Sequence, residues 1–154
     1  MTGSEYRDLI ASYIHRNFQS AGLVVYTEIN LGKTIIGKAR KVDVFVVQEA
    51  TQRALSIECK YQDTKGTTDE KIPYALQDLT ALRVPACLCY AGDGWSRGVL
   101  HTLAASSLAA YCLPDASDAR RTDGTVELDH VLAATFSIWS EVLPASRRWR
   151  QELE

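Results

Sequence analysis

The chain of 154 residues has the composition of an ordinary globular protein, with 46% hydrophobic and 23% charged residues. Its formal net charge of −2 excludes a protein that coats nucleic acid nonspecifically, although local clusters of Lys and Arg can still contact phosphate. No apolar stretch approaches the roughly 20 residues of a membrane span, and residues 1–5 lack the features of a signal peptide. We therefore expect a cytoplasmic protein, away from membranes, with a single domain over residues 1–154.

Four cysteines occur in the sequence, and two of them are one residue apart in an apolar run. No further Cys or His pair has the spacing of a zinc site, and a protein of this size does not need disulfides to build a core. We expect all four to be reduced and buried: Cys59, Cys87, Cys89 and Cys112.

The first predicted element is a helix over Glu5–Ser20, because apolar residues recur there at the i, i+3, i+4, i+7 positions of one helix face. Thr2 and Glu5 have the spacing of a capping box, so position alone favours a helix-start carboxylate for Glu5. Glu5 also lies at the edge of the apolar stripe, from which it could reach over a sheet. Both interpretations stay open on spacing alone.

A strand is predicted at Leu23–Ile29, which is rich in β-branched and aromatic residues. The segment Leu31–Lys41 follows as a flexible and locally cationic loop. Such a loop suits a phosphate backbone, although a solvated turn is the alternative. Its candidate nucleic-acid contacts are Lys33, Lys38, Arg40 and Lys41.

The next two predicted strands, Val42–Val47 and Ala54–Tyr61, form a hairpin around the polar loop Glu49–Gln52. A symmetric register around this loop sets Asp43 directly opposite Glu58. Directly opposed residues share a face of the sheet, with Cβ atoms about 4.5–5.5 Å apart. The sequence therefore predicts two carboxylates side by side in adjacent strands.

Two carboxylates held this close repel each other unless a cation lies between them or one is protonated. Lys60 lies two residues after Glu58 and therefore on the same face. Asp43 and Glu58 can supply the oxygen ligands that Mg²⁺ prefers, and Lys60 can orient a water molecule and offset charge on a phosphate. This cluster suits hydrolysis of a phosphodiester.

The rest of the sequence is predicted to alternate between helix and strand. Gln77 lies off the apolar stripe of the helix that begins at Ile72, so it is either simply exposed or in contact with the lysine or a phosphate. The further predicted elements are a strand at Ala86–Ala91, a helix at Trp95–Tyr111, a short strand at Cys112–Leu113, a helix at Val126–Val142 and a last basic segment at Ser146–Leu153. We expect a core at about residues 4–113 and a C-terminal helical extension at about residues 126–153.

Asp43 and the run Glu58-Cys59-Lys60, preceded by a helix that carries Glu5, resemble the PD-(D/E)XK nuclease superfamily. This superfamily includes restriction endonucleases and Holliday-junction resolvases. The resemblance covers about Ser4–Ala91, with Val42 where the family name has proline. It implies an α/β, restriction-endonuclease-like αβββαβ core, in which helices flank a central mixed sheet, followed here by C-terminal helices.

The resemblance also implies roles for individual residues. Asp43 and Glu58 would bind the metal together with the backbone carbonyl of Cys59, and Lys60 would be the catalytic lysine. Glu5 would be the acidic residue on the first helix, as a catalytic and metal-binding group, and Gln77 would match a polar position on the following helix.

These observations predict a metal-dependent nuclease that hydrolyses DNA with Mg²⁺, for which Mn²⁺ can substitute. An endonuclease that cuts both strands would act as a homodimer. One alternative is a catalytically silent nucleic-acid-binding or assembly subunit with the same fold. A second alternative is a structural α/β domain in which Lys60 forms a buried salt bridge with Asp43 or Glu58.

Overall fold

The sheet is the centre of the computed structural model, which describes residues 1–34 and 36–151 and, at residues 67 and 68, only the backbone. Within these residues five strands form one mixed sheet in the order β1-β2-β3-β4-β5. The first three strands are antiparallel neighbours, whereas β4 and β5 continue the sheet in parallel with β3. The strands are β1 (Leu23–Lys33), β2 (Ala39–Gln48), β3 (Ala54–Tyr61), β4 (Ala86–Ala91) and β5 (Ala109–Tyr111).

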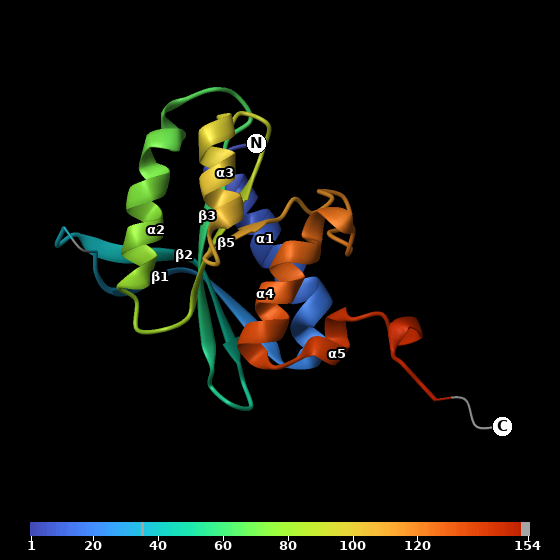
Figure 1. Ribbon diagram of the computed structural model, residues 1–154. Helices are drawn as coiled ribbons and strands as arrows, with labels where there is room; N and C mark the ends of the chain where they lie inside the picture. The colour runs from blue at the N-terminus through green and yellow to red at the C-terminus, as the bar shows by residue number, and fades with distance from the viewer. Residues whose placement is uncertain (35, 152–154) are drawn as a thin grey trace.

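Helices cover both faces of the sheet, with α1 and α4 on one face and α2 and α3 on the other (Figure 1). No helix among the described residues is long and apolar enough to cross a membrane. The helices are α1 (Gly3–Phe18), α2 (Ile72–Thr80), α3 (Arg97–Ala105), α4 (Val126–Phe136) and α5 (Trp139–Val142), with short 3₁₀ turns at Gln19–Ala21, Thr67–Lys71, Asp123–Thr125 and Ala145–Arg147.

The order of the first six main elements is α1, β1, β2, β3, α2 and β4. This order is the αβββαβ core expected from the sequence, and the α/β class with a mixed, helix-flanked sheet is confirmed. β4 lies between β3 and β5 and is buried on both faces, as its nearly continuous apolar run predicts.

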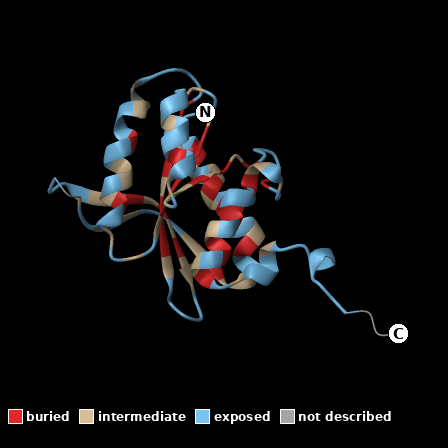
Figure 2. Ribbon diagram, in the orientation of Figure 1, coloured by how far each residue is buried: buried red, intermediate tan, exposed pale blue. Residues whose placement is uncertain are grey.

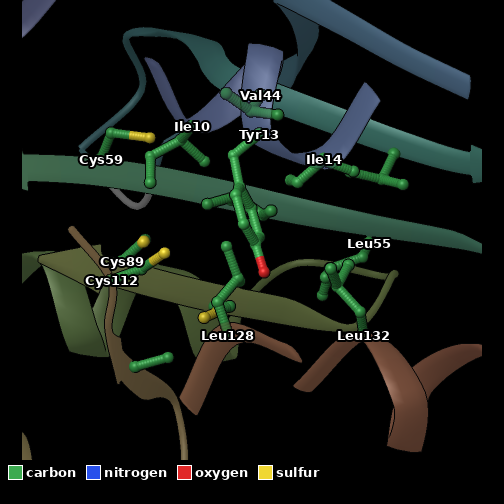
Figure 3. Close-up of a cluster of buried hydrophobic side chains, with 14 of the residues drawn as sticks. Ile10, Tyr13, Ile14, Val44, Leu55, Cys59, Cys89, Cys112, Leu128 and Leu132 are labelled. Atoms are coloured by element: carbon green, nitrogen blue, oxygen red, sulfur yellow. The ribbon is translucent and has the colours of Figure 1, made fainter. Parts of the chain in front are cut away.

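The larger hydrophobic core lies between the sheet and the pair α1 and α4 (Figure 3). Alternate residues of a strand point to the same face, so Val44 and Val46 of β2 and Ile57 of β3 all pack here against α1. Figure 2 shows buried positions along the sheet-facing sides of α1 and α4. Full burial of one such aliphatic side chain stabilises the fold by about 1.5–3 kcal/mol. All four cysteines are free and buried, as expected.

The smaller core lies on the opposite face, under α2 and α3. Leu88 and Tyr90 of β4 pack there against Ile72 and Leu79 of α2, and Leu103 of α3 completes the contact. The alternate residues of β3 that point to this face are Ser56, Glu58 and Lys60. The predicted cluster therefore lies on the face of the sheet that has the smaller hydrophobic core.

The predicted helix Trp95–Tyr111 is wrong at both ends. Ser96 caps α3 by accepting the N–H of Val99, and Ser106 ends the helix in an extended conformation. Residues 109–111 leave the helical pattern to pair with β4 as β5, three residues before the expected strand at Cys112–Leu113. Pairing with a buried neighbouring strand outweighs the helix propensity of this Ala-rich segment.

Two further predictions, for the segment Leu31–Lys41 and for the helix Val126–Val142, differ from the structure. Both ends of the expected loop Leu31–Lys41 are strand, since β1 runs to Lys33 and β2 begins at Ala39. The β1–β2 register shifts between Asn30 and Lys33. The expected helix Val126–Val142 is broken at Ser137, whose φ of 58° is left-handed and ends α4. Residue 35 of that loop and residues 152 and 153 of the C-terminal segment lie outside the described residues.

Candidate active site

The candidate site lies where β2 and β3 stop pairing. Their antiparallel ladder runs from Val47–Ala54 to Val44–Ile57, which is the register predicted from the loop length, and one more step would set Asp43 against Glu58. The ladder ends before that step. Asp43 Oδ2 instead accepts a hydrogen bond from the backbone N–H of Cys59 at 2.8 Å. The negative charge of Asp43 reaches Glu58, so the two carboxylates are neighbours where the ladder ends.

Lys60 belongs to the same cluster. Its Nζ lies 3.2 Å from Glu58 Oε1, and both side chains are partly buried, with 23% and 29% exposed. Glu58 and Lys60 also line a groove of about 610 Å³ between β3, α2 and the start of β2. The structure thus brings together Asp43, Glu58 and Lys60, as the hairpin register and strand alternation predict.

Burial raises the pKa of Asp43 above its ordinary value, and the nearby Glu28 adds to this effect. The Cys59 N–H, Lys60 and Arg7 act in the opposite direction but do not cancel it. The pKa of Glu58 is also raised, first by burial and then by the negative charge of Asp43, while Lys60 opposes the shift. One lysine therefore does not neutralise the two carboxylates, and an added cation would be favourable.

The donor set fits a hard divalent cation. Two carboxylates are present, and the backbone carbonyl of Cys59 points to the same side of β3 as its N–H, toward Asp43. No group of three or more His, Cys, Asp and Glu side chains able to hold a metal occurs in the described part of the protein. Mg²⁺ suits such a sparse set, because it keeps several waters and takes further oxygen ligands from a phosphate.

Glu5 is not part of the cluster. Its carboxylate accepts the backbone N–H of Thr2 at 3.0 Å, while Thr2 Oγ1 accepts the N–H of Glu5, which is a complete capping box. Glu5 lines a separate hollow with Leu9 and Ala116. Arg7, two residues further on and so on nearly the opposite side of the helix, is the α1 side chain that influences Asp43. The helix-start role that position alone favours is the one observed.

Of the five predicted nucleic-acid contacts, two line the active-site groove and three do not. Arg40 and Lys41 line the active-site groove, whereas Lys33 lines a neighbouring cavity that also contacts Arg40. Lys38 is an exposed turn residue whose carbonyl oxygen accepts the N–H of Thr34. Gln77 is exposed and does not line the groove.

The α2 side chain that faces the cluster is Asp78, one residue after Gln77. Asp78 lines the groove, raises the pKa of Glu58 and accepts a hydrogen bond from Arg40 Nη2 at 2.9 Å. Both side chains of this ion pair are largely buried. The pair joins α2 to the start of β2 across the groove. Tyr74, one turn earlier on α2, is partly exposed at the groove lining.

Glu28 was not expected near the site. It falls between Thr27 and Ile29, which pair with Val44 and Val42, so the β1–β2 register sets it beside Asp43. Its φ of 54° is left-handed, which is uncommon for a non-glycine residue, and its carboxylate pairs with Arg7 at 2.8 Å. The strand register could have revealed Glu28 in the sequence, whereas its left-handed conformation has no sequence signal.

The chain belongs to the PD-(D/E)XK nuclease superfamily, since the family profile described as the PD-(D/E)XK nuclease superfamily domain matches residues 2–139. The resemblance inferred from sequence is thereby confirmed, and the match extends beyond the core into α5. A search of curated proteins gave no match.

Among solved structures, the chain is similar to one titled "Crystal Structure of Protein of Unknown Function AF1548", with 13% sequence identity and a TM-score of 0.41. The alignment covers 66% of this protein and 53% of that one, so the sequence spans about half of that protein's length.

Proposed function

We propose that the protein is a metal-dependent nuclease that hydrolyses phosphodiester bonds of DNA. The observation that carries this proposal is the pair of carboxylates, Asp43 and Glu58, placed with Lys60 where β2 and β3 separate beside an open groove. The membership of the superfamily supports a nuclease-type chemistry for this arrangement. The DNA substrate and the metal requirement are part of the proposal.

Each residue of the cluster would have a distinct task. Asp43 and Glu58 would hold the metal, together with the backbone carbonyl of Cys59, and the Cys59 N–H fixes the Asp43 carboxylate. Bound Mg²⁺ would supply Lewis-acid polarisation of the phosphate and a water of lowered pKa. Lys60, released from Glu58 by the bound cation, would orient the attacking water and offset charge that develops on the phosphate.

The partners and location remain predictions. A single domain of this size that cuts both strands of a duplex would need a second copy, so we propose a homodimer for double-strand cleavage. We also propose that residues 1–154 act as a single domain, in the cytoplasm, with Mg²⁺ as the metal and Mn²⁺ as a substitute.

Cleavage assays test the proposal. We expect the wild-type protein with Mg²⁺ or Mn²⁺ to cleave at least one of supercoiled, linear, single-stranded and branched DNA. Lys60→Ala and Asp43→Ala should both abolish cleavage, whereas Lys60→Ala should keep most of the DNA binding. Gln77→Ala is a matched control, since Gln77 is exposed away from the groove. Equal cleavage by the wild type and the two site variants would overturn the proposal.

The catalytically silent alternative keeps the fold and the nucleic-acid contacts. It predicts DNA binding without cleavage at any metal concentration. The presence of both carboxylates and the lysine in one cluster favours the active enzyme, because a silent subunit has no need to hold two carboxylates with raised pKa values together.

Metal titration separates the nuclease from the structural alternative, in which the Lys60–Glu58 ion pair only stabilises the fold. Mg²⁺ bound to the folded state should raise the melting temperature, with a stabilisation of about 2.7 kcal/mol at a concentration 100 times the dissociation constant. The shift should vanish in Asp43→Asn. A wild-type melting temperature that does not respond to Mg²⁺ or Mn²⁺ would favour the structural alternative.

A further inference from the structure

A second cavity adjoins the active-site groove at the edge of the sheet. It has a volume of about 590 Å³ and lies between the segment Asn30–Lys33 of β1 and the segment Ala81–Val84 that follows α2. Arg40 lines both this cavity and the groove, so the two spaces meet at its side chain. In Figure 1 the β1–β2 hairpin projects from the sheet beside the C-terminal end of α2.

The charge of this cavity differs from that of the groove. Three cations line it, Lys33, Arg40 and Arg83, and its lining contains no acidic residue. Over the described residues neither Lys33 nor Arg83 forms an ion pair, and both are exposed. A cationic concavity in a protein with a net charge of −2 creates a local field that attracts anions.

Arg40 adds a second observation at the junction. Its Nη2 donates to Asp78 Oδ1, whereas its Nε is buried and no described residue accepts a hydrogen bond from it. A buried donor without an acceptor is unfavourable. A phosphate can accept two parallel N–H donors of one guanidinium. A small shift of the Arg40 side chain toward an anionic oxygen would therefore give acceptors to both its Nε and its Nη2.

We propose that the cavity lined by Lys33, Arg40 and Arg83 is a second phosphate-binding subsite. It would hold a backbone phosphate of the same nucleic-acid strand whose scissile phosphate lies beside Asp43 and Glu58. This inference rests on the proposed function for its substrate. It implies that the enzyme requires a strand that extends past the cleavage site toward the β1–β2 hairpin.

Salt-dependent binding tests the subsite without cleavage. Fluorescence anisotropy with a fluorescein-labelled oligothymidylate in EDTA gives the dissociation constant over a range of salt concentrations. Each phosphate contact contributes about 0.7 to the slope of log affinity against log salt for a single strand. Because the subsite holds one phosphate, we expect Lys33→Ala/Arg83→Ala to lower the slope by about 0.7. The matched control is Arg16→Ala/Arg120→Ala, which removes the same charge from α1 and from the loop after β5, and should leave the slope unchanged.

The outcomes for the subsite and for the nuclease are distinguishable. A wild-type slope that the Lys33 and Arg83 substitutions leave unchanged, or an equal loss in the control variant, overturns the subsite and leaves the nuclease untouched. A selective loss of slope in a protein that cleaves no DNA supports the subsite and overturns the nuclease. A wild-type protein that does not bind the oligonucleotide overturns the subsite.

Discussion

Asp43 accepts the backbone N–H of Cys59 at the point where β2 and β3 stop pairing. The side chain of one strand thus replaces a backbone acceptor of the ladder, and this contact holds the carboxylate in place although burial raises its pKa. The contact needs an acceptor oxygen but no charge, so its structural and chemical roles can be separated by substitution.

Asp43→Asn keeps an oxygen for the Cys59 N–H and removes the charge. Because the pKa of Asp43 is raised by folding, the native state holds the proton more tightly than the unfolded state, and ionisation lowers stability as the pH rises. Without metal at neutral pH the variant should be more stable by about 1 kcal/mol. The difference should vanish below the ordinary Asp pKa of 3.8. Urea unfolding in EDTA at both pH values measures this, and a less stable variant at neutral pH would contradict it.

Glu5 should matter for stability and not for cleavage, because its carboxylate closes the capping box of α1. Glu5→Ala and Thr2→Ala should each lower the free energy of unfolding by about 1 kcal/mol. Both variants should cleave DNA at the wild-type rate at a temperature at which they are folded. If Glu5→Ala lost cleavage while Thr2→Ala kept it, Glu5 would have the role that the family resemblance implies.

The Arg40–Asp78 ion pair should be costly to break from one side only. Arg40→Met removes the cation that donates to the largely buried Asp78 carboxylate, which should lower stability by about 3 kcal/mol. Arg40→Met/Asp78→Leu removes both charges and should be more stable than Arg40→Met alone. A double-mutant cycle by thermal or urea unfolding measures the coupling, and additive effects would show that the pair contributes little.

Gly92 should not tolerate a side chain. A Cβ at this position would clash with the backbone carbonyl group of Gln62, and its φ of 102° is left-handed. Gly92→Ala should therefore lower stability by about 4 kcal/mol or more. Gly98 is the matched control, because it lies in α3 with nothing near its Cβ position, so Gly98→Ala should stabilise the protein by about 0.5–1 kcal/mol. Similar unfolding midpoints for the two variants would contradict this account.

The register of the β2–β3 hairpin, and with it the closeness of Asp43 to Glu58, was predictable because a short polar loop fixes the register of a hairpin. Strand alternation then placed Lys60 on the same face. These arguments use only local geometry, which a sequence contains. The strands at Ala54–Tyr61 and Ala86–Ala91 were predicted with their observed bounds for the same reason.

The neighbours of the cluster were less predictable because they depend on how separate elements pack. The rotation of α1 against the sheet decides that Arg7, and not Glu5, approaches Asp43. The seating of α2 decides that Asp78 faces the groove and Gln77 faces away. Spacing along one helix gives the angle between its residues but does not give the direction of the helix face. The end of α3 at Ser106 similarly depends on the pairing of β5 with β4.

Cys59 stands between Glu58 and Lys60 in β3, and its side chain is buried in the larger core on the other face of the sheet. Figure 3 shows it above the neighbouring Cys89 and beside Ile10 of α1. Because alternate residues of one strand share a rigid backbone, Glu58 and Lys60 cannot shift without moving Cys59 against that packed layer. The packing of Cys59 in the larger core therefore holds the candidate site in place from the opposite face of the sheet. Substitution of Cys59 by a larger or a smaller side chain should alter the positions of Glu58 and Lys60 without changing any polar group of the site.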